Sequence, residues 1–195
     1  QISVLGIIQK TFDLIGKPRM TLIELENALD DKVWDIYAKG LTTTVNQIDS
    51  DYAKKYSVRY KPKSVSELAM LTGAIRPNFA DYREDFIMRK KCPNPVEKMD
   101  KLFASTNGYI IFQENLMQFF EWLGISPAKS ISLIKKISKK KIKKEDFDAL
   151  TITLKENWIK ENGSETGFDE TWEKIQSMMG YGYNSPHALA MAYDS

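Results

Sequence analysis

Cysteine and histidine are almost absent from this sequence. Its 195 residues include one cysteine, Cys92, and one histidine, His187. A single cysteine excludes an internal disulfide, and so few thiol and imidazole groups exclude the common zinc sites. Any metal that acts here is therefore expected to be a hard cation bound by carboxylates. Because no second histidine or paired base lies near Cys92 in the sequence, we interpret it as an incidental surface thiol.

Long apolar runs are also missing. No stretch reaches transmembrane length, and the N-terminus lacks the charged region, apolar core and cleavage site of a signal peptide. We therefore expect no membrane partner and a cytoplasmic location. With 43% hydrophobic residues, the chain can nevertheless build a core in one domain or two small ones.

Lysine is abundant in one short stretch. Seven of the ten residues at 135–144 are lysine, with no acid among them: Lys135, Lys136, Lys139, Lys140, Lys141, Lys143 and Lys144. The whole chain carries a net charge of only +2, so the rest of it is net acidic and the basicity is local. Such a patch attracts phosphates through steering and counterion release. The alternative interpretation is a solvated helix end with surplus lysines.

Turn and cap signals divide the chain into mostly helical segments. Apolar spacing predicts helices over 5–15, 30–39, 65–75, 79–90, 113–123, 144–161 and 168–179, with further helices that start at Pro127 and Pro186. The helix from Pro127 runs its last turn into the lysines, where positive charge suits the helix dipole. Residues 42–48 are rich in β-branched side chains and are expected to form a short strand or an extended link. We therefore predict a mainly α protein with a few short strands.

A glycine- and tyrosine-rich turn precedes the last of these helices. Ser185 is predicted as its N-cap, Pro186 as its first helical residue, and His187 lies just inside it. A helix that starts there points unpaired backbone N–H groups outward, which suits a phosphate, and His187 would add a donor. The alternative is an ordinary turn that joins two helices.

These residues resemble a known family. The segment Gly180-Tyr-Gly-Tyr-Asn184, followed by Ser-Pro-His187-Ala, is similar to the glycine-tyrosine-glycine-phenylalanine-asparagine and histidine-alanine motif of bacterial C-family replicative DNA polymerases, the alpha subunit of DNA polymerase III. Six further segments resemble the family in the same order: 4–7, 43–50, 74–77, 86–90, 108–114 and 133–141.

The resemblance implies a helical fingers domain. Residues 1–6 would be the end of a palm-type strand, and residues 7–195 a fingers domain that is incomplete at its C-terminus. The implied function is to bind an incoming nucleoside triphosphate and primer-template DNA during DNA replication, with the remainder of the polymerase chain, its palm and thumb, as a further partner. We assign nucleotide binding to Lys135, Lys136, Arg76, His187 and Asn184, and DNA binding to Lys139, Lys140, Lys141, Lys143 and Lys144.

Three departures from the family pattern bear on catalysis. Ser3 stands where the family has a metal-binding aspartate, and a serine cannot replace an anionic magnesium ligand. Lys135 and Lys136 replace paired arginines, which keeps the charge but loses bidentate phosphate geometry. Ser185-Pro186 stands in place of a lysine. We therefore expect Mg²⁺ to act in the parent polymerase without binding to this chain alone, and we assign this chain no catalytic residue and no metal ligand.

Two other functions remain open at this point. The first is a non-catalytic nucleic-acid-binding paralogue or accessory protein derived from the polymerase, which Ser3 favours. The second is a helical interaction module whose lysines bind acidic proteins. Polymerase and DNA-binding functions both call for Tyr181 or Tyr183 to be exposed near the lysines, whereas an interaction module leaves these rings packed in the turn.

Overall fold

The computed structural model describes residues 7, 10–18, 20–139, 141–179 and 183–195, and this part of the chain is almost entirely helical. The prediction of a mainly α protein is confirmed. Within the described ranges the β-structure consists of one isolated parallel β-bridge between Phe112 and Tyr183. The palm-type strand end expected at 1–6 lies outside them. No helix in the described part is both long and apolar enough to span a membrane.

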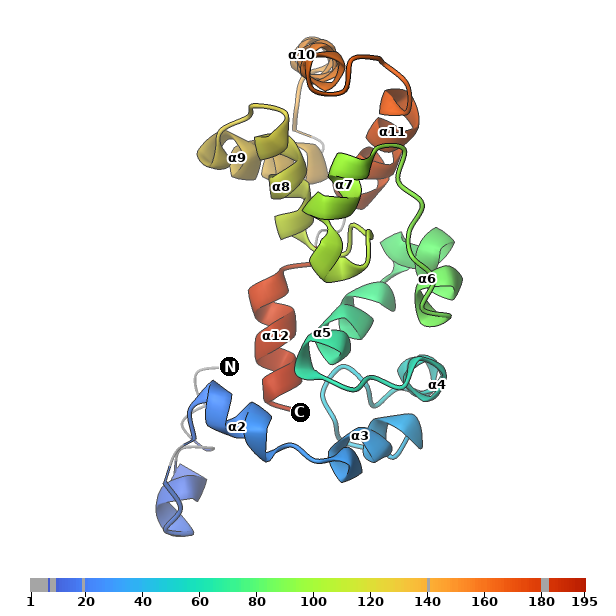
Figure 1. Cartoon of the computed structure of the whole chain (residues 1–195). Helices are drawn as coiled ribbons and strands as arrows, with labels where there is room; N and C mark the ends of the chain where they lie inside the picture. Colours follow the sequence, from blue (N-terminus) through green and yellow to red (C-terminus); the bar gives the residue numbers. More distant parts are fainter. Residues whose placement is uncertain (1–6, 8–9, 19, 140, 180–182) are drawn as a thin grey trace.

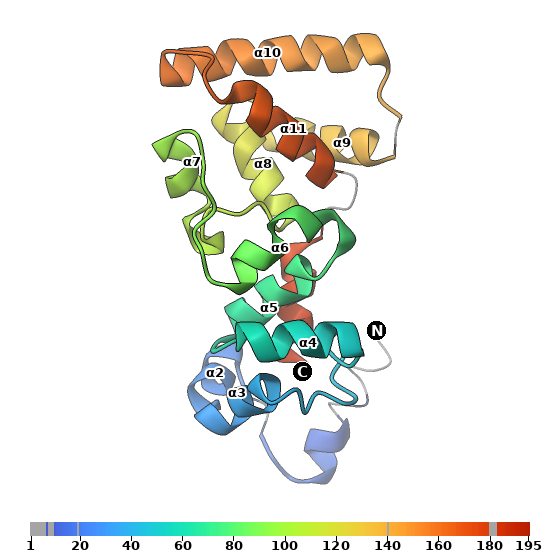
Figure 2. The same ribbon diagram turned by 90° about the vertical axis from the view of Figure 1, so that its right-hand side faces the viewer.

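The helices form two groups along the long axis of the molecule (Figures 1 and 2). The lower group contains α2 (Leu22–Ala28), α3 (Asp31–Ala38), α4 (Asp51–Tyr60), α5 (Val65–Ala74), η1 (Pro77–Phe79), α6 (Ala80–Ile87) and α12 (Ser185–Tyr193). The upper group contains α7 (Glu97–Leu102), η2 (Ala104–Thr106), α8 (Gln113–Trp122), α9 (Pro127–Ser138), α10 (Lys144–Asn162) and α11 (Phe168–Met179). Although α12 comes last in the sequence, it returns to the lower group and packs against α5.

Local caps explain several helix starts. Asp30 and Ser64 are the N-caps of α3 and α5, and both side chains accept hydrogen bonds from backbone N–H groups in the first turns of these helices. Helices α2, α4 and α7 form where the apolar spacing predicts none. For two of them a signal is present, because Thr21 and Glu24 make a capping box at α2 and Ser50 caps α4.

Residues 42–48 form neither of the two expected structures, a short strand or an extended link. This segment is a series of turns, in which Thr44 and Gln47 adopt left-handed backbone angles with φ of 72° and 71°. The hydroxyl of Thr42 donates to the carbonyl oxygen of Ile48 at 2.7 Å, and both residues are fully buried. The β-branched residues therefore close a compact loop against the core and do not pair with a neighbouring strand.

Aromatic rings connect the core across both groups. Phe79 lies 5.6 Å from Tyr109 between ring centroids, and both rings are buried where the two groups meet. In the upper group Trp158 of α10 contacts Trp122 at 5.3 Å and Phe168 at 5.9 Å. The face predicted for this helix therefore does turn inward, with Trp158 fully buried.

Cys92 is not a surface thiol as expected. It is 7% exposed and lines a small cavity with Tyr82, Asn94 and Lys174. Burial raises the pKa of its thiol. Cys92 is therefore an unreactive core residue, since reactive thiols need a lowered pKa.

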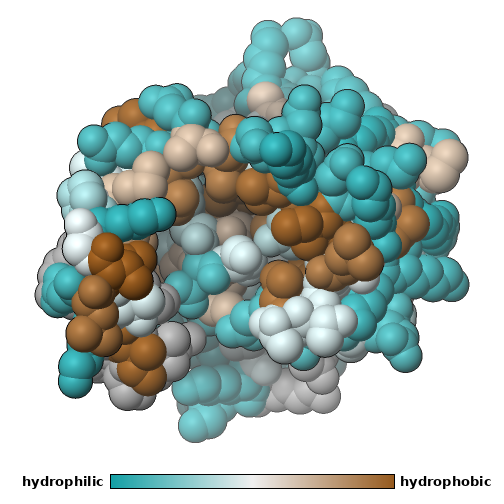
Figure 3. All heavy atoms as spheres, turned by 90° about the horizontal axis from the view of Figure 1, so that it is seen from below, coloured by the Kyte–Doolittle hydropathy of each residue, from teal (hydrophilic) through white to brown (hydrophobic). Residues whose placement is uncertain are grey.

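The lower face of the molecule carries exposed apolar side chains. Six of them lie in the N-terminal segments: Ile7, Leu14, Ile15, Met20, Leu22 and Ile23. Figure 3, a view from below, shows apolar groups gathered around a hollow on this face. Helix α2 buries no residue and is tied to α12 by a hydrogen bond from the Tyr193 hydroxyl to Glu26. Short helices depend on tertiary packing for their stability, so the exposed apolar side chains of this lower face are suited to contact another protein domain.

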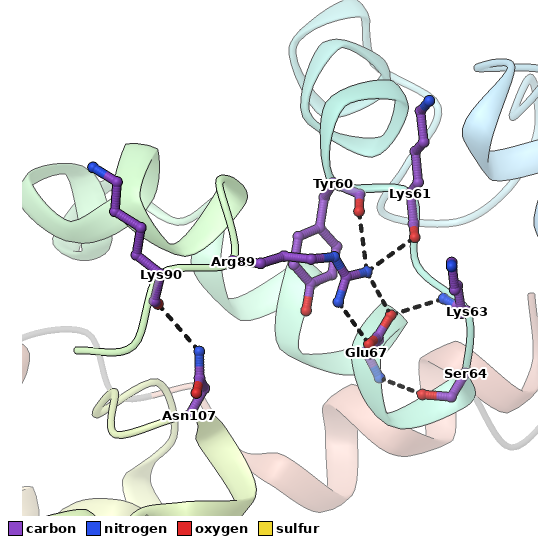
Figure 4. A network of polar contacts seen from close by, with 8 residues as sticks. All are labelled: Tyr60, Lys61, Lys63, Ser64, Glu67, Arg89, Lys90 and Asn107. Atoms are coloured by element: carbon purple, nitrogen blue, oxygen red, sulfur yellow. Dashed lines mark hydrogen bonds and ion pairs between the residues drawn. The ribbon is translucent and has the colours of Figure 1, made fainter.

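Arg89 joins α4, α5 and α6 (Figure 4). Its guanidinium makes two 2.8 Å hydrogen bonds to the carboxylate of Glu67, and it also donates to the carbonyl oxygens of Tyr60 at 3.2 Å and Lys61 at 3.1 Å. Its Cζ atom lies 4.5 Å from the centre of the Tyr60 ring. Arg89 thereby satisfies carbonyl groups that the end of α4 leaves unpaired.

Replacing Glu67 by glutamine is expected to lower the free energy of unfolding by about 1 kcal/mol at neutral pH, because the partly exposed ion pair with Arg89 is lost. The hydrogen bonds from Arg89 lower the pKa of Glu67 below its ordinary 4.5. This stabilisation is therefore present above pH 4.5 and is lost as the pH falls through the lowered folded value. Urea unfolding across this range measures it.

Glu97→Gln provides the matched control, because Glu97 also pairs with a cation but its side chain is 80% exposed. Its effect is expected to be clearly smaller than that of Glu67→Gln, because solvent screens an exposed ion pair. Equal losses in the two variants, or a Glu67→Gln effect that does not shrink in acid, would contradict the prediction.

Candidate nucleotide and nucleic-acid interface

The lysines after the middle of α9 form an exposed basic surface. We call this the lysine surface and define it as Lys135, Lys136, Lys139, Lys141, Lys143 and Lys144, all of which are exposed. Lys140 lies outside the described residues. Within the described part of the chain, none of these six side chains makes an ion pair or hydrogen bond. Their charge is therefore free to act on an external anion.

Helix α9 presents these lysines because its opposite face is apolar. Ile134 is buried and Leu133 and Ile137 are half-buried, and the helix packs against α8 and α11. Lys135 and Lys136 lie in the last turn, near the negative end of the helix dipole. The helix dipole therefore stabilises the positive charge at this end of α9 without an acidic side chain.

A groove of about 390 Å³ runs between α9 and α10 beside the lysine surface. Lys129, Leu133 and Lys136 line it from α9, and Asp146 and Leu150 line it from α10. Lys129 is absent from the residues that the sequence singled out. The seven-residue spacing from Lys129 to Lys136 was the available signal, because it corresponds to two helical turns on one face.

A second group of candidate residues meets around Tyr183. The Cζ atom of Arg76 lies 4.6 Å from the centre of the Tyr183 ring, and the His187 ring meets it edge to face at 5.8 Å. We call Arg76, Tyr183 and His187 the tyrosine cluster. Arg76 also donates to the side-chain oxygen of Gln47. Among the described residues, its Nε atom and the Tyr183 hydroxyl are buried without a hydrogen-bond partner.

Two features of the lower group build this cluster. Arg83 donates to the carbonyl oxygens of Ala74 at 2.9 Å and Arg76 at 2.7 Å, which fixes the turn after α5. Gly73 lets the tyrosine approach α5, since an added Cβ would lie 3.4 Å from Tyr183 Cδ1 and 2.5 Å from Ile111 Cγ2. The position of Tyr183 therefore depends on a helix that is far from it in the sequence.

The N-cap of α12 is Asn184, one residue before the predicted Ser185. Its side-chain oxygen accepts from the His187 N–H at 3.1 Å. The Ser185 N–H donates to the carboxylate of Glu114 at 2.8 Å, and the Asn184 amide donates to the same carboxylate at 2.9 Å. Asparagine caps helices as well as serine does, and Glu114 adds a tie to α8. The unpaired N–H groups expected here for a phosphate are therefore already bonded within the protein.

The structure separates the assigned nucleotide-binding residues into two places. Arg76, Asn184 and His187 lie together at α5 and the start of α12, whereas Lys135 and Lys136 belong to the lysine surface on α9 in the upper group (Figures 1 and 2). Tyr183 is half-buried, with its ring 6.4 Å from that of Phe112. It packs within the turn and is not an exposed stacking platform beside the lysines. Residues 180–182 lie outside the described part.

The described residues contain no group of three or more histidine, cysteine, aspartate or glutamate side chains placed to hold a metal ion. Ser3, at the family's aspartate position, lies outside this part. The chemistry that these surfaces offer is therefore charge attraction and hydrogen bonding to anions.

Comparison with known proteins gives a consistent result. The profile of a family described as the bacterial DNA polymerase III alpha subunit finger domain matches residues 4–162. Similar curated proteins include DNA polymerase III subunit alpha from Aquifex aeolicus, which is 30% identical over 88% of this chain and 15% of the relative. The Thermotoga maritima protein of the same name is 26% identical over 98% of this chain and 23% of the relative. The Bacillus subtilis protein is 28% identical over 95% of this chain and 17% of the relative. The chain thus spans less than a quarter of these relatives.

Proposed function

Since the chain belongs to the finger-domain family of bacterial DNA polymerase III alpha subunits, we propose that residues 7–195 bind an incoming nucleoside triphosphate and primer-template DNA during DNA replication. The work of such a domain would take place in the cytoplasm. In this proposal Lys135, Lys136, Arg76, Asn184 and His187 serve the nucleotide. The lysines from Lys139 onward serve the DNA backbone.

The lysine surface is the observation that carries this proposal. Six exposed lysines that have no partner among the described residues, in an otherwise net acidic chain, are positioned to neutralise phosphates. Binding to a polyanion then gains free energy from the release of condensed counterions. Both substrates present phosphates, so Lys135 and Lys136 can act on a triphosphate by the same chemistry that their neighbours use on DNA.

The tyrosine cluster supports the nucleotide part of the proposal. Arg76 and His187 bring a permanent cation and an imidazole beside one ring, and the Arg76 Nε–H has no partner in the described part. A buried donor without a partner costs free energy unless a ligand satisfies it. An incoming nucleotide would supply such an acceptor.

We propose that catalysis belongs to a longer parent polymerase. Magnesium ions bound elsewhere in that protein would activate the phosphoryl transfer, and this chain would contribute fixed positive charge to stabilise the developing negative charge. The exposed apolar face below α2 (Figure 3) supports contact with the remaining chain, its palm and thumb. The chain by itself is expected to bind without polymerising.

Replacing Lys139 and Lys141 together by glutamine is expected to weaken binding to labelled primer-template DNA by about tenfold at low salt. The slope of log affinity against log salt should fall by about one for each lysine, because fewer counterions are released. Fluorescence anisotropy over a salt series measures both quantities.

A matched control changes the exposed Lys32 and Lys160 to glutamine, which removes the same charge away from the lysine surface. An unchanged salt slope in the first variant, or an equal loss in the control, would remove the lysine surface from the proposal.

Adding Mg²⁺ and the deoxynucleoside triphosphate complementary to the template separates the alternatives. Tighter binding favours the fingers function, and DNA binding without this response favours the non-catalytic paralogue that Ser3 suggests.

A further inference from the structure

Glu114 lies at the junction of two helix N-termini. It is the second residue of α8, and its carboxylate accepts hydrogen bonds from the Ser185 N–H at 2.8 Å and the Asn184 amide at 2.9 Å, both at the start of α12. The N-terminal ends of both helices, which are the positive ends of their dipoles, therefore meet at one carboxylate. Hydrogen bonds to a charged acceptor are also stronger than those between neutral groups.

The same junction holds the backbone on both sides of Tyr183. The Gln113 N–H donates to the Tyr183 carbonyl oxygen at 2.9 Å, and Glu114 holds the two residues that follow the tyrosine. Asn184 extends the connection, because its side-chain oxygen caps the N–H of His187. One carboxylate thus links α8 to the helix that carries His187.

The base of this junction is itself fixed. The side-chain oxygen of the buried Asn115 accepts from the N–H groups of Ile111 at 3.1 Å and Phe112 at 3.0 Å, which orders the segment before α8. Glu114 therefore projects from a firmly held backbone. Its carboxylate can therefore fix the position of Asn184 and Ser185 at the start of α12.

We propose that Glu114 is a positioning residue for nucleotide binding: through Ser185 and Asn184 it holds Tyr183 and His187 in place beside Arg76. The proposal rests on the proposed function, because it assigns a role within the nucleotide-binding tyrosine cluster. Glu114 itself needs no contact with the nucleotide. Its carboxylate sets the geometry in which the imidazole and guanidinium groups meet their ligand.

Glu114→Gln tests this role by a minimal change. The new amide offers one acceptor oxygen to two donors, the Asn184 amide and the Ser185 N–H, so one of the two hydrogen bonds is lost while the size of the side chain is kept. His187 is the only histidine, so its ring protons give a single reporter in NMR spectra, shifted by the nearby Tyr183 ring. We expect this shift to move toward that of an exposed histidine. The affinity for a template-complementary deoxynucleoside triphosphate, measured with primer-template DNA and Mg²⁺, should fall by about fivefold.

A rescue variant separates positioning from a general loss of stability. Asn184→Asp alone opposes two carboxylates and should also disturb the His187 signal. In Glu114→Gln combined with Asn184→Asp, the amide nitrogen at position 114 can donate to the new carboxylate at position 184. That carboxylate can still accept from the His187 N–H, and the amide oxygen at position 114 can still accept from the Ser185 N–H. The double variant has the same net charge as the original chain, because Glu114→Gln removes one negative charge and Asn184→Asp adds one. We expect the His187 shift to return to that of the original chain.

The outcomes are distinct. Glu121→Gln, an exposed change on the same helix, should alter neither readout. A Glu114→Gln protein with an unchanged His187 shift, or a double variant whose His187 shift is displaced as far as in the worse single variant, would overturn the proposal. Because the NMR readout uses the chain without nucleotide, a failure of every protein to bind nucleotide would count against the proposed function, and the His187 shift would still decide the role of Glu114.

Discussion

Replacing Trp158 by alanine is expected to lower the free energy of unfolding by about 3–5 kcal/mol. The side chain is fully buried and contacts the rings of Trp122 and Phe168, and its indole N–H donates to the Thr166 carbonyl oxygen at 3.3 Å. Its removal leaves a large cavity and an unpaired carbonyl in the upper group. Urea denaturation followed by circular dichroism measures the loss.

Ile152→Ala on the same helix is the control for this prediction. Ile152 is 60% exposed, so its truncation should change the stability by no more than about 0.5 kcal/mol. Similar losses in the two variants would mean that α10 is not held to the core by its tryptophan face. The groove beside the lysine surface would then lack a firm wall.

Replacing Gly73 by valine is expected to cost about 3 kcal/mol of stability. Even a Cβ at this position would lie 2.5 Å from the Cγ2 methyl of Ile111, and that methyl is attached close to the backbone and cannot swing aside. The new side chain would also press on Tyr183. We therefore expect the same variant to disturb the His187 signal, because the tyrosine ring lies between α5 and His187.

A double-mutant cycle checks the cause. Ile111→Ala removes the methyl that meets the new side chain, so the combined variant should be more stable than the sum of the two single effects by at least about 1 kcal/mol. Strict additivity would show that the cost of Gly73→Val arises from something other than this contact. Thermal and urea unfolding of the four proteins provide the comparison.

Helices with strong local signals were predictable from the sequence. The cap Asp30, the cap Ser64 and the apolar face that includes Trp158 each act within a few residues, so their pattern survives in any tertiary context. Helices α2, α4 and α7 are short and were missed, although Thr21 and Ser50 carried cap signals. Apolar spacing over six to ten residues gives too few repeats to reveal such helices by itself.

Two further features depend on effects that no local pattern contains. Cys92 is flanked by lysine and proline and looks exposed, yet packing of α11 residues such as Lys174 around it places it in the core. The start of α12 looks ready for a phosphate, yet Glu114 occupies it from a helix seventy residues away. In both cases the deciding neighbour is distant in the sequence.

The sequence by itself determined the mainly α class, the local concentration of lysines and, through motifs in a consistent order, the polymerase family. Helix formation and charge density depend on neighbouring residues, so they can be read along the chain. The tertiary structure decided which of these residues meet. Arg76 reaches Tyr183 because α12 packs against α5 and Gly73 leaves room for the tyrosine, and Lys135 stays apart because α9 is held by α8 and α11. Such encounters are set by the burial of apolar faces from distant segments, and this cooperative packing is absent from any short stretch of sequence.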